Sequence, residues 1–513
     1  MPTRRTWFHA LGPYLASVCL VVLLSLPNLP LPFSDSQAVL VTGADVIKNG
    51  GVLYRDFRGA AEPAAFLFYF LGGALFGYSE YGVHAFELLY HMAFCGFLVF
   101  TLRHEFTHRW LTGLAPVAAI GAYYMLARPS SMTVPEILAA FPLYLCIWFA
   151  GHTWSTSRKR AAGYFCSGVA GGLAALFKFW MAPVAFGVWI VAAVIAQRVN
   201  HHRSAALLRQ RIAPALSGFT LMLSAAGVWL WEQNALADLY RIAVSNASLF
   251  QGQALVNVGD PIAALWFVRD FAAWILLAAV ACFSLQGRLF RRPFWAGLAC
   301  WAAVGGVLIG IENTPWTPNR FLAITPAVGL LAVRGLDRLL SLVRLTSPAS
   351  SWRVPVTACA GTLLILSPEL LNWTAKARAL TPGAVRNEPA PVEFFQRRMD
   401  TNYDAVRTST RFLSAPDAKP GSVFVFGSPI LLWLSGRRPA LAVNGWDLEG
   451  WDAQQWDAVA AQLRAQPPAY VFVDPGYESL IADMCPALTA WLKSDYRAVQ
   501  TDGVGVWYRH EPR

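Results

Sequence analysis

Charged residues are scarce in this sequence. Only 14% of its 513 residues are Asp, Glu, Lys or Arg, and 56% are hydrophobic, whereas soluble domains usually carry roughly 25% charged residues. Apolar runs long enough for spans of about 20 residues recur from Leu11 to Leu371. This pattern argues against a soluble protein and predicts one that crosses a membrane many times.

Cysteine pairs and nucleotide motifs are missing. The eight cysteines form no CxxC pair, seven of them fall in apolar runs, and Cys485 stands alone in the C-terminal region. Neither a metal-site spacing nor a disulfide framework is therefore indicated. There is also no G-x-G-x-x-G and no P-loop. We predict no cofactor; a divalent metal ion stays open, although no ligand motif supports it.

Basic residues follow every second apolar run. By the positive-inside rule this alternation predicts a cytoplasmic N-terminus, about eleven spans and an external C-terminal region. The first run begins after Arg4 and Arg5 like a secretory signal, but "LSLPNLPLPF" has no small-x-small cleavage site, which favours an uncleaved anchor. The predicted spans are 10–30, 82–102, 110–127, 135–151, 161–177, 180–196, 212–231, 266–285, 295–311, 321–336 and 354–371.

The chain divides into two predicted domains, a transmembrane domain at 1–371 and an extracytoplasmic α/β domain at 372–513. In the second, "SVFVFG" and "AYVFVDPG" are typical of buried strands, and "WDAQQWDAVAAQLRAQ" is typical of an amphipathic helix. Its residues Trp433, Trp446 and Trp451 either stack on sugars or pack against the membrane domain.

The first external loop, 31–81, contains the most unusual charges. Asp35 follows the first span directly, and "SQAVLVTGADVIKNGG" predicts a short amphipathic helix that ends at a glycine pair. A second apolar helix, from Pro63 to Phe76, is too short to cross and is expected to lie at the interface. Between them, "LYRDFRGAAEP" places two arginines and two acids at the membrane surface.

This loop resembles the first external loop of the GT-C glycosyltransferases, in the branch that holds protein mannosyltransferases and lipid A aminoarabinose transferases. The resemblance rests on an acid after the first span, a G-x-x-Y-R-D-F motif and a proline-led apolar helix ending in "LFGYSE", and it extends to three later segments. The matching residues are Asp35, Gly51, Tyr54, Arg55, Asp56, Phe57, Glu136 in "VPEILAAFPLYLCIW", Lys178 in "AGGLAALFKFW", and Arg320 and Pro326 in "NRFLAITPAVGLLAVRGL".

The resemblance implies a bacterial cytoplasmic-membrane enzyme. It would move a sugar from a polyprenyl-phosphate carrier to an acceptor hydroxyl, on a glycolipid, polysaccharide or protein, at the outer face. An inverting displacement of this kind needs a carboxylate to take the hydroxyl proton and cations to hold the leaving phosphate. Asp35 is the predicted base. The alternative is that it caps the following helix together with Ser34.

The sequence departs from the family pattern at three places. Relatives often carry two adjacent acids after the first span, but Ser36 follows Asp35 here, so Asp56 is the candidate supporting acid. Ala61 and Glu62 replace a lysine commonly found before the proline, and His84 stands where an arginine often occurs.

The remaining site residues divide into two predicted groups. Lys178 and Arg320, which could instead be interfacial anchors, would bind the donor phosphate with help from Arg55 and Arg58. Glu136 would contact the acceptor or pair with Arg128. The complete predicted substrate-binding set is Tyr54, Glu62, His84, Glu136, Glu312 and Asn319.

Two other functions stay open at this point. A ligase or polymerase that uses a lipid-diphosphate donor would need similar charges. A transporter or flippase would also be polytopic, but it usually has ionisable residues or broken helices near the midplane and repeated halves. Here the charges lie at the outer ends of the spans, which favours the transferase.

Overall fold

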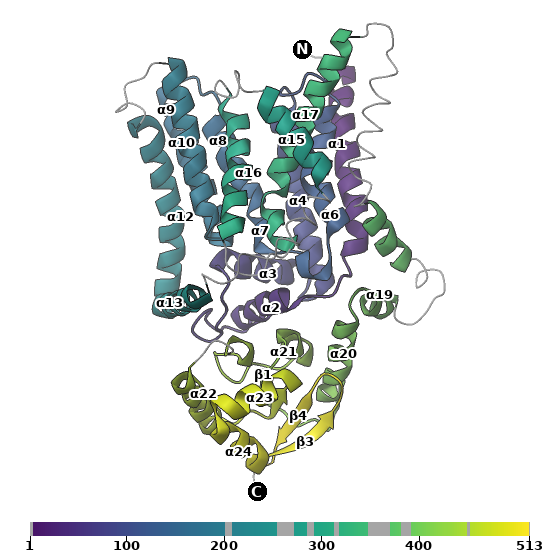
Figure 1. Cartoon of the computed structure of the whole chain (residues 1–513), viewed down its shortest axis with the longest axis vertical. Helices are drawn as coiled ribbons and strands as arrows, with labels where there is room; N and C mark the ends of the chain where they lie inside the picture. Colours follow the sequence, from purple (N-terminus) through teal and green to yellow (C-terminus); the bar gives the residue numbers. More distant parts are fainter. Residues whose placement is uncertain are drawn as a thin grey trace.

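A long helical bundle forms one end of the molecule, and a small sheet flanked by helices forms the other (Figure 1). The computed structural model describes residues 4–200, 208–253, 271–284, 292–311, 318–346, 370–380, 391–448 and 452–511. The predicted span at 354–371 lies almost wholly outside these residues, as do the first residues of the span at 266–285.

The bundle and the segments that cap it contain α-helices and short 3-10 or π turns, the latter named η. In chain order they are α1 (Arg4–Ser25), η1 (Leu26–Asn28), α2 (Asp35–Lys48), α3 (Pro63–Phe76), α4 (Glu80–Leu102), α5 (Leu111–Pro116), η2 (Val117–Gly121), α6 (Ala122–Leu126), η3 (Pro129–Ser131), α7 (Pro135–Leu138), α8 (Ala140–Gly151), α9 (Ser157–Phe177), α10 (Met181–Asn200), η4 (Leu208–Ile212), α12 (Ala213–Glu232), α13 (Leu236–Gln253), α15 (Ala272–Ser284), α16 (Pro293–Ile311), η6 (Pro318–Ala323) and α17 (Thr325–Thr346).

Four helical stretches in the described part are long and apolar enough to cross a membrane: Glu80–Leu102, Met181–Arg198, Arg209–Glu232 and Pro293–Gly310. The count of about eleven spans stays a prediction. The predicted span 110–127 consists of α5, η2 and α6, the one at 135–151 consists of α7 and α8, and two further spans differ at their edges. The first was expected at 10–30, but α1 ends at Ser25, because Pro27 cannot donate the next helical hydrogen bond. The span expected at 321–336 continues to Thr346, and there Arg334 pairs with Asp337 at 2.8 Å, which neutralises charge within the helix.

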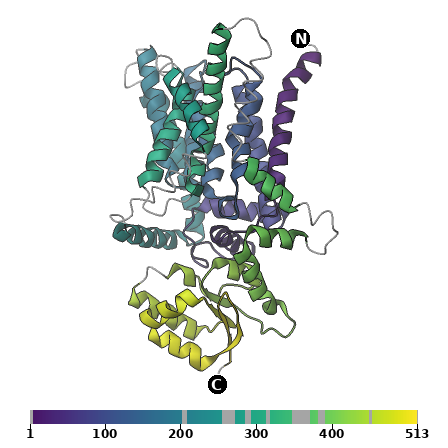
Figure 2. The same ribbon diagram turned by 45° about the vertical axis from the view of Figure 1, so that its right-hand side comes forward.

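Three helices lie across the lower end of the bundle. These are α2, α3 and α13, and the view turned by 45° shows the same arrangement (Figures 1 and 2). The bounds of α2 and α3 match the helices expected in the first external loop. Because α3 runs crosswise to the long helices, its apolar side chains cover the end of the bundle and do not form a span.

The C-terminal sheet has four strands in the order β1-β2-β4-β3. β1 pairs parallel with β2, whereas β4 is antiparallel to both of its neighbours. β1 and β2 lie where the two apolar runs predicted strands, and every residue in both is buried. The elements of this region are α19 (Pro391–Met399), α20 (Thr401–Thr410), η7 (Arg411–Ser414), β1 (Val423–Phe426), α21 (Pro429–Ser435), η8 (Gly445–Asp447), α22 (Ala453–Ala465), β2 (Tyr470–Val473), α23 (Pro475–Met484), α24 (Pro486–Asp495), β3 (Tyr496–Thr501) and β4 (Val506–His510).

The sheet region is attached directly to the loop at 31–81. The backbone amide of Arg58 donates to the Ala442 carbonyl at 2.7 Å, and the Asn444 side chain donates to the Arg58 carbonyl at 3.1 Å. The rings of Phe33 and Trp433 meet edge to face, with centroids 5.9 Å apart. Trp433 was expected either to stack on sugars or to pack against the membrane domain, and its contact with Phe33 is a packing contact. Trp451 lies outside the described residues.

Candidate active site

Asp35 is the first residue of α2, and Ser34 is the residue that caps this helix. Gln37 Oε1 accepts hydrogen bonds from the backbone N–H of Ser34 at 2.8 Å and from its hydroxyl at 2.9 Å. Both bonds run from Ser34 to the Gln37 side chain, and Gln37 is the third helical residue, as in a capping box. Ser34 occupies the cap position, whereas Asp35 is the first residue of the helix.

The Asp35 carboxylate is reached by solvent and faces the C-terminal region. Its Oδ1 accepts a hydrogen bond from the hydroxyl of Ser428. Crowding by neighbouring protein raises the pKa of Asp35 above its usual value; the Ser428 hydrogen bond opposes this shift, and the charge of Asp400 adds to it. A carboxyl group with a raised pKa is a stronger proton acceptor once it is ionised.

Asp56 lies in a tight turn and is paired with its neighbour. Arg55 donates to both Asp56 oxygens at 2.9 Å, and the Val52 amide donates to Oδ2 at 2.8 Å. The hydrogen bond from Arg55 lowers the pKa of Asp56. The predicted roles of Asp56 beside the base and of Arg55 on the donor phosphate stay predictions; in this structure the two charges neutralise each other.

Tyr54 holds the same turn together from inside. It is buried, its hydroxyl donates to the Ala61 carbonyl at 2.8 Å, and its backbone has φ +70°, a conformation that is uncommon for a residue other than glycine. Substrate contact was predicted for Tyr54, yet its side chain is engaged within the loop. Arg58, the predicted phosphate ligand next to it, is half-buried and fixes the C-terminal region through its backbone.

A second cluster of predicted residues forms where α9 meets α3 and α7. Lys178 follows the last turn of α9, and its Nζ lies 3.2 Å from Glu136 Oε1. Glu62, the residue that precedes α3, accepts from the Phe179 amide at 2.9 Å. Burial raises the pKa of Glu62, and the positive charge of Lys178 opposes that shift. The ion pair of Glu136 is with Lys178 and not with Arg128, which was one of the two partners considered. Contact of Glu136 with the acceptor, the other one, stays a prediction.

Arg320 belongs to this cluster through the element that carries it. η6 packs against α7, which contains Glu136, and against η3. The side chain of Arg320 is partly buried. Glu312 and the side chain of Asn319, both predicted to bind substrate, lie outside the described residues.

His84, which was predicted to bind substrate, lies inside the bundle. Its ring is buried in α4, Nδ1 lies 3.0 Å from the Leu29 carbonyl, and the ring meets the edge of Phe33 at 5.6 Å. The predicted substrate contact of His84 stays a prediction. In this structure the buried imidazole supports the segment that leads to Asp35.

Sequence reasoning missed two residues. Glu87 is buried on α4 and accepts from the hydroxyls of Tyr123 at 2.5 Å and Thr133 at 2.9 Å, which fixes the turn that leads to Glu136. Its signal was an acid within the first third of the predicted span at 82–102. Ser428 was the other. A serine before a proline indicates a helix cap, but no local pattern connects it to a residue nearly 400 positions earlier.

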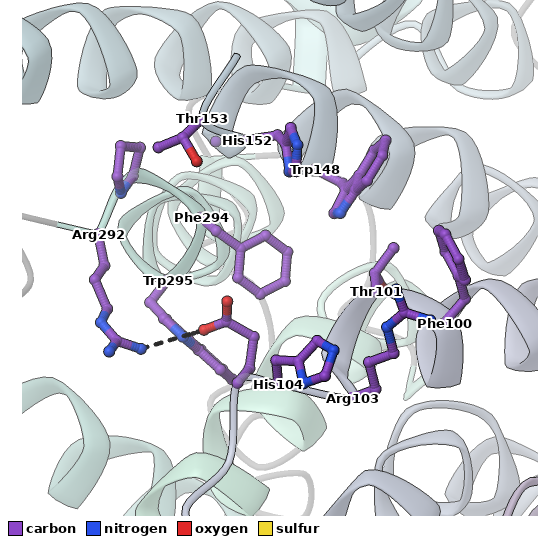
Figure 3. A pocket seen from close by; sticks show the side chains of 13 residues that line it. Phe100, Thr101, Arg103, His104, Trp148, His152, Thr153, Arg292, Phe294 and Trp295 are labelled. Carbon is purple, nitrogen blue, oxygen red and sulfur yellow. Dashed lines mark hydrogen bonds and ion pairs between the residues drawn. The ribbon is translucent and has the colours of Figure 1, made fainter. Parts of the chain in front are cut away.

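The structure also has a cavity of about 450 Å³ at the opposite end of the bundle. Figure 3 shows Arg103, His104, Trp148 and Phe294 around it, with Arg292 paired to the carboxylate of Glu105. None of the predicted site residues lines this cavity. Among the described residues, no group of three His, Cys, Asp or Glu side chains is arranged to hold a metal ion.

No family model and no curated protein matches this chain. Solved structures do match it over nearly its whole length. ArnT from Cupriavidus metallidurans, bound to undecaprenyl phosphate, has a TM-score of 0.59 and 15% identity over 99% of this chain and 98% of its own. The oligosaccharyltransferase AglB from Archaeoglobus fulgidus, in complex with an inhibitory peptide and a dolichol-phosphate, has a TM-score of 0.53 and 13% identity. This match covers 99% of the present chain and 75% of the AglB chain. This chain therefore has the fold of the GT-C membrane glycosyltransferases.

Proposed function

We propose that this protein is a membrane glycosyltransferase that moves a sugar from a polyprenyl-phosphate donor to an acceptor hydroxyl, with inversion at the sugar carbon. The observation that carries the proposal is the Asp35 carboxylate. It lies at the end of the bundle that meets the C-terminal region, where the Ser428 hydroxyl donates to it, and the adjacent Ser34 occupies the cap position of α2. The shared fold with ArnT and AglB supports the same class of reaction.

The proposed reaction is a single displacement. The acceptor hydroxyl gives its proton to Asp35 as its oxygen bonds to the anomeric carbon. The bond from that carbon to the phosphate oxygen breaks, and the polyprenyl phosphate leaves with both bonding electrons. A positioned base contributes about a hundred- to ten-thousand-fold to such a step.

Positive charge would stabilise the leaving phosphate. Lys178 supplies it at the end of α9, and η6 brings Arg320 beside the element that carries Glu136. The ion pair between Lys178 and Glu136 keeps the ammonium group at this position before donor binding. We propose that the donor phosphate displaces Glu136 from Lys178.

The experiment compares Asp35→Asn with Asp56→Asn in a deletion strain of the host. Mass spectrometry of surface glycans measures the product that depends on this gene, and native mass spectrometry measures binding of undecaprenyl phosphate to each purified variant. Asp35→Asn should bind the lipid normally and lose at least about a hundredfold in product formation. Normal product from Asp35→Asn, with none from Asp56→Asn, would transfer the base to Asp56.

A lipid-diphosphate donor is the second candidate for the same site. Undecaprenyl diphosphate in the same binding measurement separates the two. Tighter binding of the monophosphate is the expected result, and tighter binding of the diphosphate would favour a ligase or polymerase.

A further inference from the structure

The hydroxyl of Ser428 has a fixed direction. It accepts a hydrogen bond from the backbone N–H of Ile430 at 3.2 Å and donates to Oδ1 of Asp35. Because a hydroxyl carries one hydrogen, the bond from Ile430 leaves that hydrogen pointing at the carboxylate. The two hydrogen bonds therefore connect the Ile430 amide, through the Ser428 hydroxyl, to Asp35 in the loop at 31–81.

Ser428 is also held firmly relative to α2. It is the cap of α21, and α21 packs against α2. Trp433 on α21 meets Phe33 just before α2, and the backbone of Arg58 is bonded to Ala442 and Asn444. These contacts join the same two segments independently of the Ser428 hydroxyl, so its position does not depend only on its own bond to Asp35.

Among the described residues, the elements packed against α2 bring few titratable groups to the Asp35 carboxylate. α21 has none in its sequence, α3 has only Tyr69, and η3 has none, with Arg128 just before it. Asp45 and Lys48 are at the far end of α2. Asp400, the cap of α20, is the charged group that acts on the pKa of Asp35.

We propose that Ser428 is a positioning residue for the glycosyl transfer: by bonding Oδ1 of Asp35, it turns Oδ2 toward the acceptor hydroxyl. The C-terminal region would then complete the active site. This inference rests on the proposed role of Asp35. Loss of the Ser428 hydroxyl would leave the base rotationally free, and misplacement of a reacting group can cost up to about a hundredfold in rate.

The test measures product formation against pH in membrane preparations that contain the endogenous donor and acceptor. Ser428→Ala should lower the rate on the order of tenfold and move the acidic limb of the profile to higher pH, because the lost hydrogen bond had lowered the pKa of the base. Asp400→Asn keeps a cap for α20 but removes a like charge, so it should move the limb to lower pH. Ser428→Thr should restore the wild-type profile, and Ser414→Ala, an exposed serine in the same region, should match wild type throughout.

The outcomes separate this inference from the proposed function. Full activity of Asp35→Asn would overturn both. An inactive Asp35→Asn together with a wild-type rate and profile for Ser428→Ala would overturn only the role of Ser428. A faster Ser428→Ala would also contradict it, since the hydroxyl would then obstruct the base.

Discussion

At the level of single residues, neighbouring side chains have separate tasks. Ser34 satisfies the helix end through Gln37, and Asp35 turns to Ser428. Lys178 has two acids close to it in space, Glu136 on α7 and Glu62 just before α3. These acids hold the ammonium group in place, so a donor phosphate must take the place of the Glu136 carboxylate to bind it.

Lys178→Ala should weaken the binding of undecaprenyl phosphate. A hydrogen bond to a charged group is worth about 1.5 to 3 kcal/mol, which corresponds to an increase in Kd of roughly 10- to 150-fold. Native mass spectrometry or a fluorescence titration with the purified protein measures it. Lys48→Ala is the matched control, because Lys48 is an exposed lysine paired with an acid at the end of α2.

Glu136→Gln sharpens the same measurement. It removes the competing carboxylate but keeps the shape of the side chain, so the lipid should bind at least as tightly as to the wild type. If Lys178→Ala binds undecaprenyl phosphate with the Kd of the wild type, Lys178 does not bind the donor and only pairs with Glu136.

At the level of elements, the bundle depends on close helix approach as well as on apolar surface. α9 and α12 meet through glycines. A Cβ atom on Gly168 would lie 1.9 Å from the Ala215 carbonyl oxygen, and one on Gly218 would lie 2.1 Å from the Phe165 carbonyl oxygen. Small residues let the two backbones come into direct contact, which increases the van der Waals packing that helps to hold helices together in lipid.

Gly218→Ala should lower the thermal stability of the purified protein. The added methyl group meets backbone atoms that cannot move aside without separating the helices, and overpacking of this kind costs about 1 to 3 kcal/mol. Gly227→Ala on the same helix is the control. Nothing lies within 4 Å of its Cβ position, so the better helix propensity of alanine should leave Tm equal or slightly higher. Equal Tm values for Gly218→Ala and wild type would mean that α9 and α12 are not packed this closely.

At the level of the whole molecule, charge and architecture agree. The basic clusters lie at the upper end of the bundle in Figure 1. They are found at the start of α1, α9 and α16 and at the end of α4, α10 and α17. Asp35, Lys178 and the sheet region lie at the lower end. This separation is what the positive-inside rule requires if the site is external.

Reporter fusions test the orientation. A reporter fused after Arg513 should be active only outside the cytoplasm, and one inserted beside Arg203 only inside it, because basic loops are retained on the cytoplasmic side. Protease protection of the two fusions in spheroplasts measures this directly. A cytoplasmic reporter after Arg513 would contradict the proposed reaction, since the Asp35 carboxylate faces the same side as the C-terminal region.

The sequence by itself determined what depends on nearby residues. The helices Asp35–Lys48 and Pro63–Phe76 and the strands β1 and β2 follow from apolar period, prolines and glycines within a few positions. Long apolar runs predicted where many helices of the bundle lie. The predicted end of a helix was wrong where Pro27 ends α1 early and where the paired charges of α17 let this helix continue.

Only the tertiary structure decided which of these residues meet. The contacts Asp35 with Ser428, Lys178 with Glu136, and Phe179 with Glu62 join positions 393, 42 and 117 residues apart, and His84 turned inward toward the Leu29 carbonyl. Such contacts depend on how helices cross and how the sheet region docks. Packing at those crossings is set by side-chain shape across many elements, which no local sequence pattern encodes.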